Sequence, residues 1–264
     1  MYLNLFGLEI PMYGVLFWFG ILAAAATAAL IREKRGISGF DLAGSAIYTM
    51  IGAIIGAKLL YLTVSFVDIL EYASVYELSF IEMLPLVIKG GFVFYGGLIG
   101  GFLGLFIYTR QFEMELSCLL DIYATVLPLG HAIGRVGCFF GGCCYGIAYD
   151  GPFSHTYHTA TGTAPIGVAL FPVQLLEATC LVILFVFQLY LFIKKRDIKG
   201  ITVVNYVIVY AVLRFSLEFL RGDAERGLLG TLSTSQWISI AMLLLTVLVL
   251  VCTSIRKKLN FKLF

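Results

Sequence analysis

Residues 12–31 read MYGVLFWFGILAAAATAALI, a stretch without a single charged side chain. A helix needs roughly 20 apolar residues to cross about 30 Å of hydrocarbon, so this segment is long enough to span a bilayer. The rest of the chain has the same character: 60% of its 264 residues are hydrophobic, 13% are charged, and the mean hydropathy is +0.96. The sequence therefore predicts an integral membrane protein.

The apolar stretches predict an all-α fold with seven transmembrane helices. Each stretch is long enough to cross the hydrocarbon layer as a helix. Because no fixed repeat and no long linker interrupts them, we expect one polytopic membrane domain over residues 1–264. The predicted helices cover residues 12–31, 43–66, 91–109, 117–135, 174–193, 201–220 and 235–255.

The basic residues between these helices predict the topology. Most of the 18 Lys and Arg residues follow the first, third, fifth and seventh stretches. By the positive-inside rule those loops and the C-terminus are cytoplasmic, and the N-terminus lies outside. The net charge is only +2, which excludes a polybasic nucleic-acid-binding protein, so no nucleic acid partner is expected.

The remaining basic residues lie in or beside apolar stretches. A charge at the bilayer centre costs roughly 2.5–3.5 kcal/mol, so such side chains are expected to face the protein interior, a partner or a water-filled cavity. Their positions predict one cavity near the outer face that binds an anion, and the abundant anion there is a lipid phosphate. These residues are Lys58, Lys89, Arg135, Arg214, Arg221 and Arg226.

Two groups of ionisable residues have the spacing of one helical face. His131 precedes Arg135 by four residues, so both side chains are expected on one face. Arg214, Glu218 and Arg221 follow the same rule at i, i+4 and i+7, which would set a carboxylate between two guanidiniums. Structural alternatives remain open. Arg135 can snorkel to the interface, and Glu218 can simply neutralise the arginines and fix helix packing.

Glycine is concentrated between residues 90 and 146, which hold nearly half of the 28 glycines. In GGFVFYGGLIGG (90–101) the backbone amides of Gly96 and Gly97 are expected to line a ligand groove, with close helix packing as the alternative. GRVGCFFGGCCYG (134–146) predicts an arginine at a helix end followed by an irregular, glycine-rich anion cradle. Residues 136–173 are predicted to form an outer loop region that gates the site.

Three cysteines of this segment lie on the predicted outer side. A disulfide from Cys138 to Cys143 or Cys144 and free thiols are both compatible with the sequence. No metal site is predicted, because none of the 3 histidines has ligand-like spacing to the cysteines. No cofactor motif is present either, so no cofactor is expected.

A set of motifs in one order gives a family resemblance that covers most of the chain. The motifs are Tyr13-Gly14, GAKLLY (56–61), GGFVFYGGLIGG (90–101), GRVGCFFGGCCYG (134–146), PVQLLE (172–177), RFSLEFLRGD (214–223) and LSTSQW (232–237). With them the chain resembles the prolipoprotein diacylglyceryl transferases of bacterial plasma membranes.

The resemblance implies a multi-pass transferase of the bacterial plasma (inner) membrane that acts in lipoprotein biosynthesis. Such an enzyme takes a diacylglyceryl group from phosphatidylglycerol and places it on the lipobox cysteine of a prolipoprotein signal peptide. A thioether forms and glycerol phosphate is released. The implied partners are therefore phosphatidylglycerol, the prolipoprotein and the surrounding membrane lipids.

Matched position by position, the family motifs imply the site residues. Arg135 and Arg214 match essential arginines, and Glu218 and Arg221 match their companions. Together with His131 and Tyr95, the residues Arg135, Arg214 and Glu218 form the expected catalytic set. Substrate binding is expected at Tyr13, Lys58, Gly96, Gly97, Gly134, Gly137, Cys138, Gly146, Gln174, Glu177 and Arg221.

This chain departs from the family pattern at positions in the functional core. Tyr95 stands where well-known members carry His, Cys138 where they carry Asn, Cys143 where they carry an acidic residue, and Lys58 where Arg is typical. The chain therefore resembles a divergent, cysteine-containing branch. Two alternative functions stay open. One is a related enzyme that uses phosphatidylglycerol with another acceptor, such as a glycan or a small thiol, and the other is a non-catalytic lipid-binding or lipid-transport protein.

The implied reaction needs two chemical contributions from the protein. The departing phosphate gains negative charge, which Arg135 and Arg214, oriented by Glu218, would stabilise. The attacking thiol, with a pKa of about 8.5 in water, must lose its proton. With Tyr95 at the usual histidine position, His131 is the nearest alternative base, because tyrosine has a reference pKa of about 10.

Overall fold

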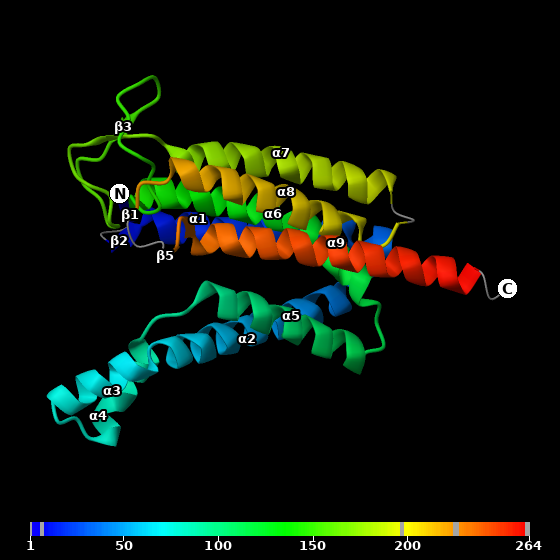
Figure 1. Cartoon of the computed structure of the whole chain (residues 1–264), viewed down its shortest axis with the longest axis horizontal. Coiled ribbons are helices and arrows are strands. Elements are labelled where there is room, and N and C mark those ends of the chain that lie inside the picture. The colour runs from blue at the N-terminus through cyan, green and yellow to red at the C-terminus, as the bar shows by residue number, and fades with distance from the viewer. Residues whose placement is uncertain (1, 6–7, 196–197, 224–226, 262–264) are drawn as a thin grey trace. The chain divides into compact units, whose positions relative to one another are not determined.

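The computed structural model describes residues 2–5, 8–195, 198–223 and 227–261, and this part of the chain is predominantly helical (Figure 1). Short antiparallel strand pairs are formed by β1 (Tyr2–Leu5) with β2 (Leu8–Pro11), β3 (His155–Thr156) with β4 (Ala169–Leu170), and β5 (Leu228–Leu229) with β6 (Leu232–Ser233). The helices are α1 (Met12–Ile31), α2 (Gly39–Val64), α3 (Phe66–Val75), α4 (Phe80–Lys89), α5 (Phe94–Gln111), α6 (Leu116–Gly141), α7 (Val173–Lys194), α8 (Ile201–Leu217) and α9 (Thr234–Phe261), with the 3-10 helices η1 (Arg32–Arg35) and η2 (Glu218–Leu220).

Six helices of the described part are long and apolar enough to cross a membrane: α1 with its 3-10 extension, α2, α6, α7, α8 with η2, and α9. The predicted stretch 91–109 also forms a helix, α5, but its glycines and its polar end at Arg110 and Gln111 lower its hydropathy. Large apolar side chains such as Trp18 (62% exposed) and Leu244 (65% exposed) cover the outside of the helices, as expected for contact with lipid.

The chain forms two compact units. The first contains Met1–Lys34 and Leu120–Phe264, and the second contains Arg35–Leu119. The second unit is therefore an insertion in sequence between α1 and α6. It includes α3 and α4, which form between the predicted helices 43–66 and 91–109 where no element was expected.

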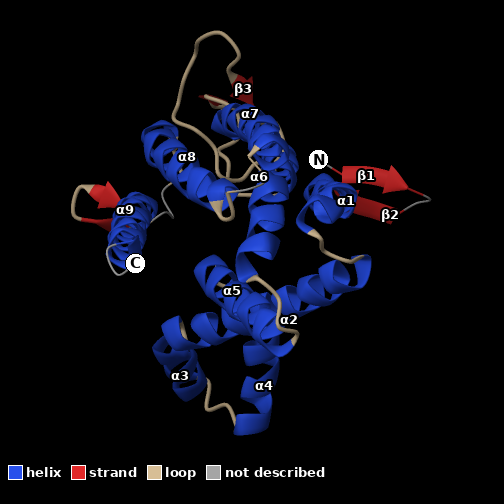
Figure 2. Cartoon of the chain, turned by 90° about the vertical axis from the view of Figure 1, so that its right-hand side faces the viewer, coloured by secondary structure: helices blue, strands red, loops and turns tan. Residues whose placement is uncertain are grey.

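In the second unit, α2 and α5 pack against each other through glycine (Figure 2). A Cβ on Gly100 would overlap the carbonyl oxygen of Gly52 and lie 2.9 Å from Gly56 Cα. A Cβ on Gly96 would overlap Gly56 O in the same way. Small residues thus let the two backbones approach closely, which is the commonest way to associate helices in lipid. Gly96 thus takes part in close helix packing, and a role of its backbone amide in a ligand groove stays a prediction.

In the first unit, α6 lies beside α1, α7 and α8, and α9 lies beside α8 (Figure 2). The contact between α1 and α6 is close, because a Cβ on Gly20 would lie 2.8 Å from Gly130 O. A small apolar cluster joins α6, α7 and α8 around Leu181, which is fully buried, and Leu184. Side chains of α6, α7 and α8 therefore face one another in the space between the three helices.

A buried polar network fixes these three helices at their other end. Asp121 of α6 accepts hydrogen bonds from Gly200 N (2.9 Å) and from Thr202 Oγ1 (2.6 Å), and so it caps the start of α8. Gln188 of α7 donates to the backbone carbonyls of Ala124 (3.2 Å) and Thr202 (2.8 Å). The network holds α6, α7 and α8 in register. It thereby helps to position the residues near the other end of this helix group, which are the last turns of α6 and α8 and the first turns of α7.

Candidate active site

Arg135 forms a buried polar contact between α6 and α7. Its Nε donates a hydrogen bond to His131 Nε2 at 3.2 Å, one turn earlier on the same face of α6. The same Nε lies 3.1 Å from Glu177 Oε1 of α7, whose side chain is only 3% exposed. The predicted pairing of His131 with Arg135 is therefore present. Glu177 keeps the guanidinium in the protein interior, where an unpaired charge would be costly.

Two tyrosines of α8, which were not among the predicted site residues, lie beside this contact. The Tyr210 ring meets the His131 ring edge-on at 5.4 Å, and Tyr206 stacks on Tyr210 at 5.6 Å. Tyr210 also interacts with Arg135. Their signal in the sequence is spacing, since Tyr206, Tyr210 and Arg214 follow one another at intervals of four residues and so share a helical face.

Arg214 is held by two helices. Its Nη2 lies 2.9 Å from Glu218 Oε2, as the i, i+4 spacing predicted, and donates a hydrogen bond to Ser235 Oγ at the start of α9 at 3.0 Å. Its buried Nη1 has no hydrogen-bond partner among the residues that the structure describes. The guanidinium is thus oriented by protein groups on one side and keeps a donor for a ligand on the other.

The prediction that Arg221 shares the helical face of Arg214 and Glu218 is wrong. The α-helix ends at Leu217, η2 follows, and Arg221 has extended backbone angles (φ −85°, ψ 139°). The Arg221 side chain forms its ion pair with Asp223. Burial alone would lower the pKa of Arg221, but the hydrogen bonds to Asp223 raise it, so the guanidinium stays charged.

The segment after Arg135 also differs from its prediction. α6 continues to Gly141 instead of ending at 135, so the irregular segment begins only at Gly142 and the outer loop region is shorter than 136–173. Apolar residues between the glycines favour continuation of the helix. Gly137 faces α1, since a Cβ there would lie 3.5 Å from Tyr13 O, whereas a Cβ on Gly134 would meet nothing within 4 Å.

The loop after α6 is joined to the end of α8 by backbone pairing. Gly146 forms an antiparallel bridge with Arg221, and Gly222 N donates to Tyr145 O at 3.0 Å. A side chain on Gly146 would overlap the carbonyl oxygen of Phe171, so only glycine fits there. On the α7 side, buried Gln174 donates from Nε2 to Cys143 O at 2.8 Å.

Four predicted site residues belong to the second unit. Lys58 donates hydrogen bonds to Ile88 O (3.2 Å) and Gly90 O (3.0 Å), which fixes the turn before α5. Tyr95, Gly96 and Gly97 lie in the first turn of α5. Their participation in the site of the first unit stays a prediction. Arg226 and the side chain of Lys89 lie outside the described residues.

The arrangement in the first unit is suited to binding a phosphate. Arg135, Arg214 and Arg221 reach the same interior from α6, α8 and the segment after η2, and each is oriented by a carboxylate. Arg135 and Arg214 both act electrostatically on His131, so both positive charges lie near that imidazole. Oriented guanidiniums in a weakly solvated site stabilise phosphate oxygens through charge-assisted hydrogen bonds.

Fold and site together define a polytopic membrane protein with carboxylate-oriented arginines between its helices. The sequence model of the prolipoprotein diacylglyceryl transferase family matches residues 1–252. The chain belongs to this family, which confirms the resemblance drawn from its motifs and makes it a membrane transferase.

Curated relatives match nearly the whole chain. The chain is similar to a phosphatidylglycerol–prolipoprotein diacylglyceryl transferase of Clostridium tetani, with 34% identity over 97% of this chain and 98% of the relative. It is also similar to a second such transferase of Clostridium perfringens, at 34% identity over 91% of this chain and 90% of the relative. A relative from Dehalococcoides mccartyi with the same name is 35% identical over 77% of each chain.

Proposed function

We propose that this protein transfers the diacylglyceryl group of phosphatidylglycerol to the lipobox cysteine of a prolipoprotein signal peptide. Family membership and the names of relatives that match most of the chain support the reaction. The observation that carries the proposal is the pair Arg135 and Arg214, whose side chains are each only 13% exposed, are oriented by Glu177 and Glu218, and both act electrostatically on His131.

The proposed chemistry is an alkyl transfer without a redox step. The cysteine sulfur attacks the glyceryl carbon that carries the phosphate, and a C–S bond forms while the C–O bond breaks. The electron pair of that C–O bond stays with the departing glycerol phosphate. Arg135 and Arg214 stabilise the charge on the leaving phosphate. One donor is Nη1 of Arg214, which has no hydrogen-bond partner among the residues that the structure describes.

The thiol proton goes to a base, and we assign this role to His131. Its Nε2 accepts a hydrogen bond from Arg135, so the lone pair that would take the thiol proton lies beside the arginine that would hold the phosphate, and it exchanges this hydrogen bond for the thiol when the substrate binds. Tyr95 is assigned a hydrogen-bonding role with the substrate. Tyr13, Gln174, Gly146 and Lys58 are assigned to substrate binding.

The proposed topology has seven transmembrane helices, with α5 as the seventh, in the bacterial plasma membrane. The N-terminus and the loop between α6 and α7 face outward, and the C-terminus is cytoplasmic. That loop runs from Gly142 to the start of α7 and ends beside Arg221 through the Gly146 bridge. We assign it the role of gating entry of the lipobox peptide.

Separate Arg135→Ala and Arg214→Ala variants test the phosphate-binding role. We expect each to lower transfer by about 10²-fold or more, because removing one preorganised donor at a developing oxyanion has that effect. Labelled phosphatidylglycerol and a lipobox peptide are incubated with the membrane-reconstituted protein, and product is measured by mass spectrometry. Arg110→Ala, at an exposed arginine of α5, is the matched control. Full transfer by both site variants would overturn the assignment.

A second candidate function keeps phosphatidylglycerol as donor and changes the acceptor. Cys138 and Cys143, which stand where the family pattern has Asn and an acidic residue, favour it. Complementation of a strain depleted of its own transferase distinguishes the two. Growth and lipid-modified lipoprotein support the first function, whereas release of glycerol phosphate only with a small thiol or a glycan supports the second. Phosphatidylglycerol held without any release would indicate a lipid-binding protein.

A further inference from the structure

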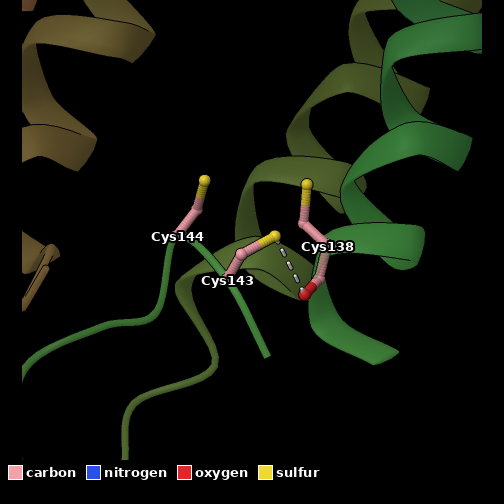
Figure 3. Close-up of side chains that lie close together, drawn as sticks. All are labelled: Cys138, Cys143 and Cys144. Carbon is pink, nitrogen blue, oxygen red and sulfur yellow. Dashed lines mark hydrogen bonds between the residues drawn. The ribbon is translucent and has the colours of Figure 1, made fainter. Parts of the chain in front are cut away.

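Three thiols meet at the end of α6. The Sγ atoms of Cys138, Cys143 and Cys144 all lie within 4.8 Å of one another, and all three cysteines are free. Figure 3 shows Cys138 on the helix and the other two on the segment that follows it, with the three sulfurs directed to a common space. Each side chain is partly buried.

The backbone brings these thiols together through a specific helix ending. Gly142 adopts a left-handed conformation (φ 68°), Gly142 N donates to Phe139 O at 3.2 Å, and Cys143 N donates to Cys138 O at 3.1 Å. This is the Schellman motif, which reverses the chain onto the last helical turn. Cys144 also has a positive φ of 53°, a backbone conformation that non-glycine residues rarely adopt. The thiols are thus held in place by the main chain.

The geometry matches the needs of a thiophilic cation. Zinc takes tetrahedral thiolate ligands with Zn–S bonds of about 2.3 Å, which places the sulfurs about 3.8 Å apart. The three Sγ atoms lie at most 4.8 Å apart in the structure. Small side-chain torsions would bring them to the distance of about 3.8 Å that a shared zinc ion requires. Sequence spacing gave no metal site here because the histidines lie elsewhere, but three thiolates need no histidine.

The charges around the cluster favour thiolates. The guanidinium of Arg135 acts electrostatically on all three cysteines, and that of Arg221 acts on Cys144 as well, and both positive charges attract the negative charge of a thiolate. Arg135 lies one helical turn before Cys138, on the same element. The cluster therefore lies directly beside the residues assigned to the phosphate.

We propose that the cluster of Cys138, Cys143 and Cys144 binds one thiophilic cation, such as Zn²⁺, and leaves one coordination position open for the thiol of the acceptor. This inference rests on the proposed function for the identity of that thiol. A thiol that coordinates zinc is deprotonated, so the cation would assist His131 in activating the nucleophile. The thiol proton passes to His131, the metal-bound sulfur forms the C–S bond while the C–O bond to the phosphate breaks, and water replaces the sulfur on the metal. Zinc is neither oxidised nor reduced.

Metal binding by the full-length protein tests the site without reference to activity. Protein reduced under anaerobic conditions in detergent is titrated with Co²⁺, then with Zn²⁺, while thiolate-to-cobalt absorption and bound metal are measured. We expect about one equivalent of metal, and X-ray absorption of the wild-type protein should give three sulfur ligands. Cys144→Ser and Cys143→Ser should lose the absorption, and the control Cys180→Ser, in α7, should keep it. No binding by the reduced wild-type protein, or a disulfide within the cluster in protein isolated from cells, overturns the site.

The open position is tested on the same cobalt-loaded protein. A lipobox peptide with cysteine should change the cobalt absorption, and the same peptide with serine should leave it unchanged. Identical spectra with both peptides overturn the activating role. Transfer is assayed separately as glycerol phosphate release, with and without chelator. Full transfer by metal-free protein overturns the role of the cation and leaves the proposed function intact, whereas metal binding without any transfer overturns the function and leaves the site.

Discussion

In the second unit, α2 and α5 pack so closely that a Cβ on Gly100 would overlap the carbonyl oxygen of Gly52. In the first unit, α6 and α7 meet instead through the buried ion pair of Arg135 with Glu177. Hydrocarbon surroundings give helices no hydrophobic reason to associate, so both contacts supply something else: close backbone approach in one case, and polar groups that have no partner in lipid in the other. Of these two contacts, only the one between α6 and α7 places ionisable groups in the protein interior.

The largest effect is expected from Glu177→Gln in the first unit. The substitution leaves the Arg135 charge buried without its carboxylate, which typically costs about 3–5 kcal/mol. Thermal unfolding of the detergent-solubilised protein measures the loss, and transfer should fall with it. Glu71→Gln, at an exposed position of α3, is the control. An unchanged unfolding temperature for Glu177→Gln would mean that the ion pair does not hold α6 and α7 together.

A smaller effect, about 1–3 kcal/mol, is expected from Gly100→Ala in the second unit, since the added methyl group overlaps backbone that cannot move aside easily. Gly97→Ala is a matched control on the same helix, because its Cβ would make ordinary contacts of 3.5 Å with Ala53 and Ala57. The same unfolding assay is used for both. Equal stability of the two variants would contradict tight glycine packing of α2 against α5.

Asp121→Asn examines the polar contact at the other end of α6, α7 and α8. Loss of the charged cap on the start of α8 is expected to cost about 1–2 kcal/mol, less than Glu177→Gln because an amide oxygen can still accept a hydrogen bond. Hydrogen exchange of the first turn of α8 measures it. Exchange as slow as in the wild-type protein would show that the cap contributes little.

The smallest effect concerns the loop between α6 and α7. Burial raises the pKa of Tyr157 to about 12, and its hydroxyl donates to Phe139 O at 2.9 Å. Since the folded form holds this proton more tightly than the unfolded chain, stability is fully present below about pH 10 and falls as the pH rises toward 12. Phenolate absorbance and unfolding followed over this range should show the loss, and Tyr157→Phe should lack it.

The sequence predicts best where one local rule decides the structure. Residues 12–31 coincide with α1 because nothing in them opposes a helix that spans lipid. The i, i+4 rule correctly pairs His131 with Arg135 and Arg214 with Glu218, since each pair lies within one uninterrupted segment or at its end.

The predictions fail where distant segments decide. Arg221 does not lie on the helical face of Arg214 and Glu218, because its backbone pairs with Gly146. Helical periodicity within one segment cannot predict such a pairing with a distant residue. Tyr210 depends on the packing of α8 against α6. The three cysteines converge only because Gly142 reverses the chain, whereas the spacing of Cys138, Cys143 and Cys144 in the sequence gives no ligand pattern.

The bridge between Gly146 and Arg221 makes the site tolerant to side-chain changes at the end where the loop after α6 meets the segment after η2. Its contacts are between main-chain atoms, as are the hydrogen bonds of Gly222 with Tyr145 and of Ile147 with Leu220. A frame joined in this way keeps its shape when neighbouring side chains are exchanged. Cysteine can therefore stand where the family pattern has Asn or an acidic residue while the arginines keep their positions. The same backbone geometry can thus support a different set of reactive side chains.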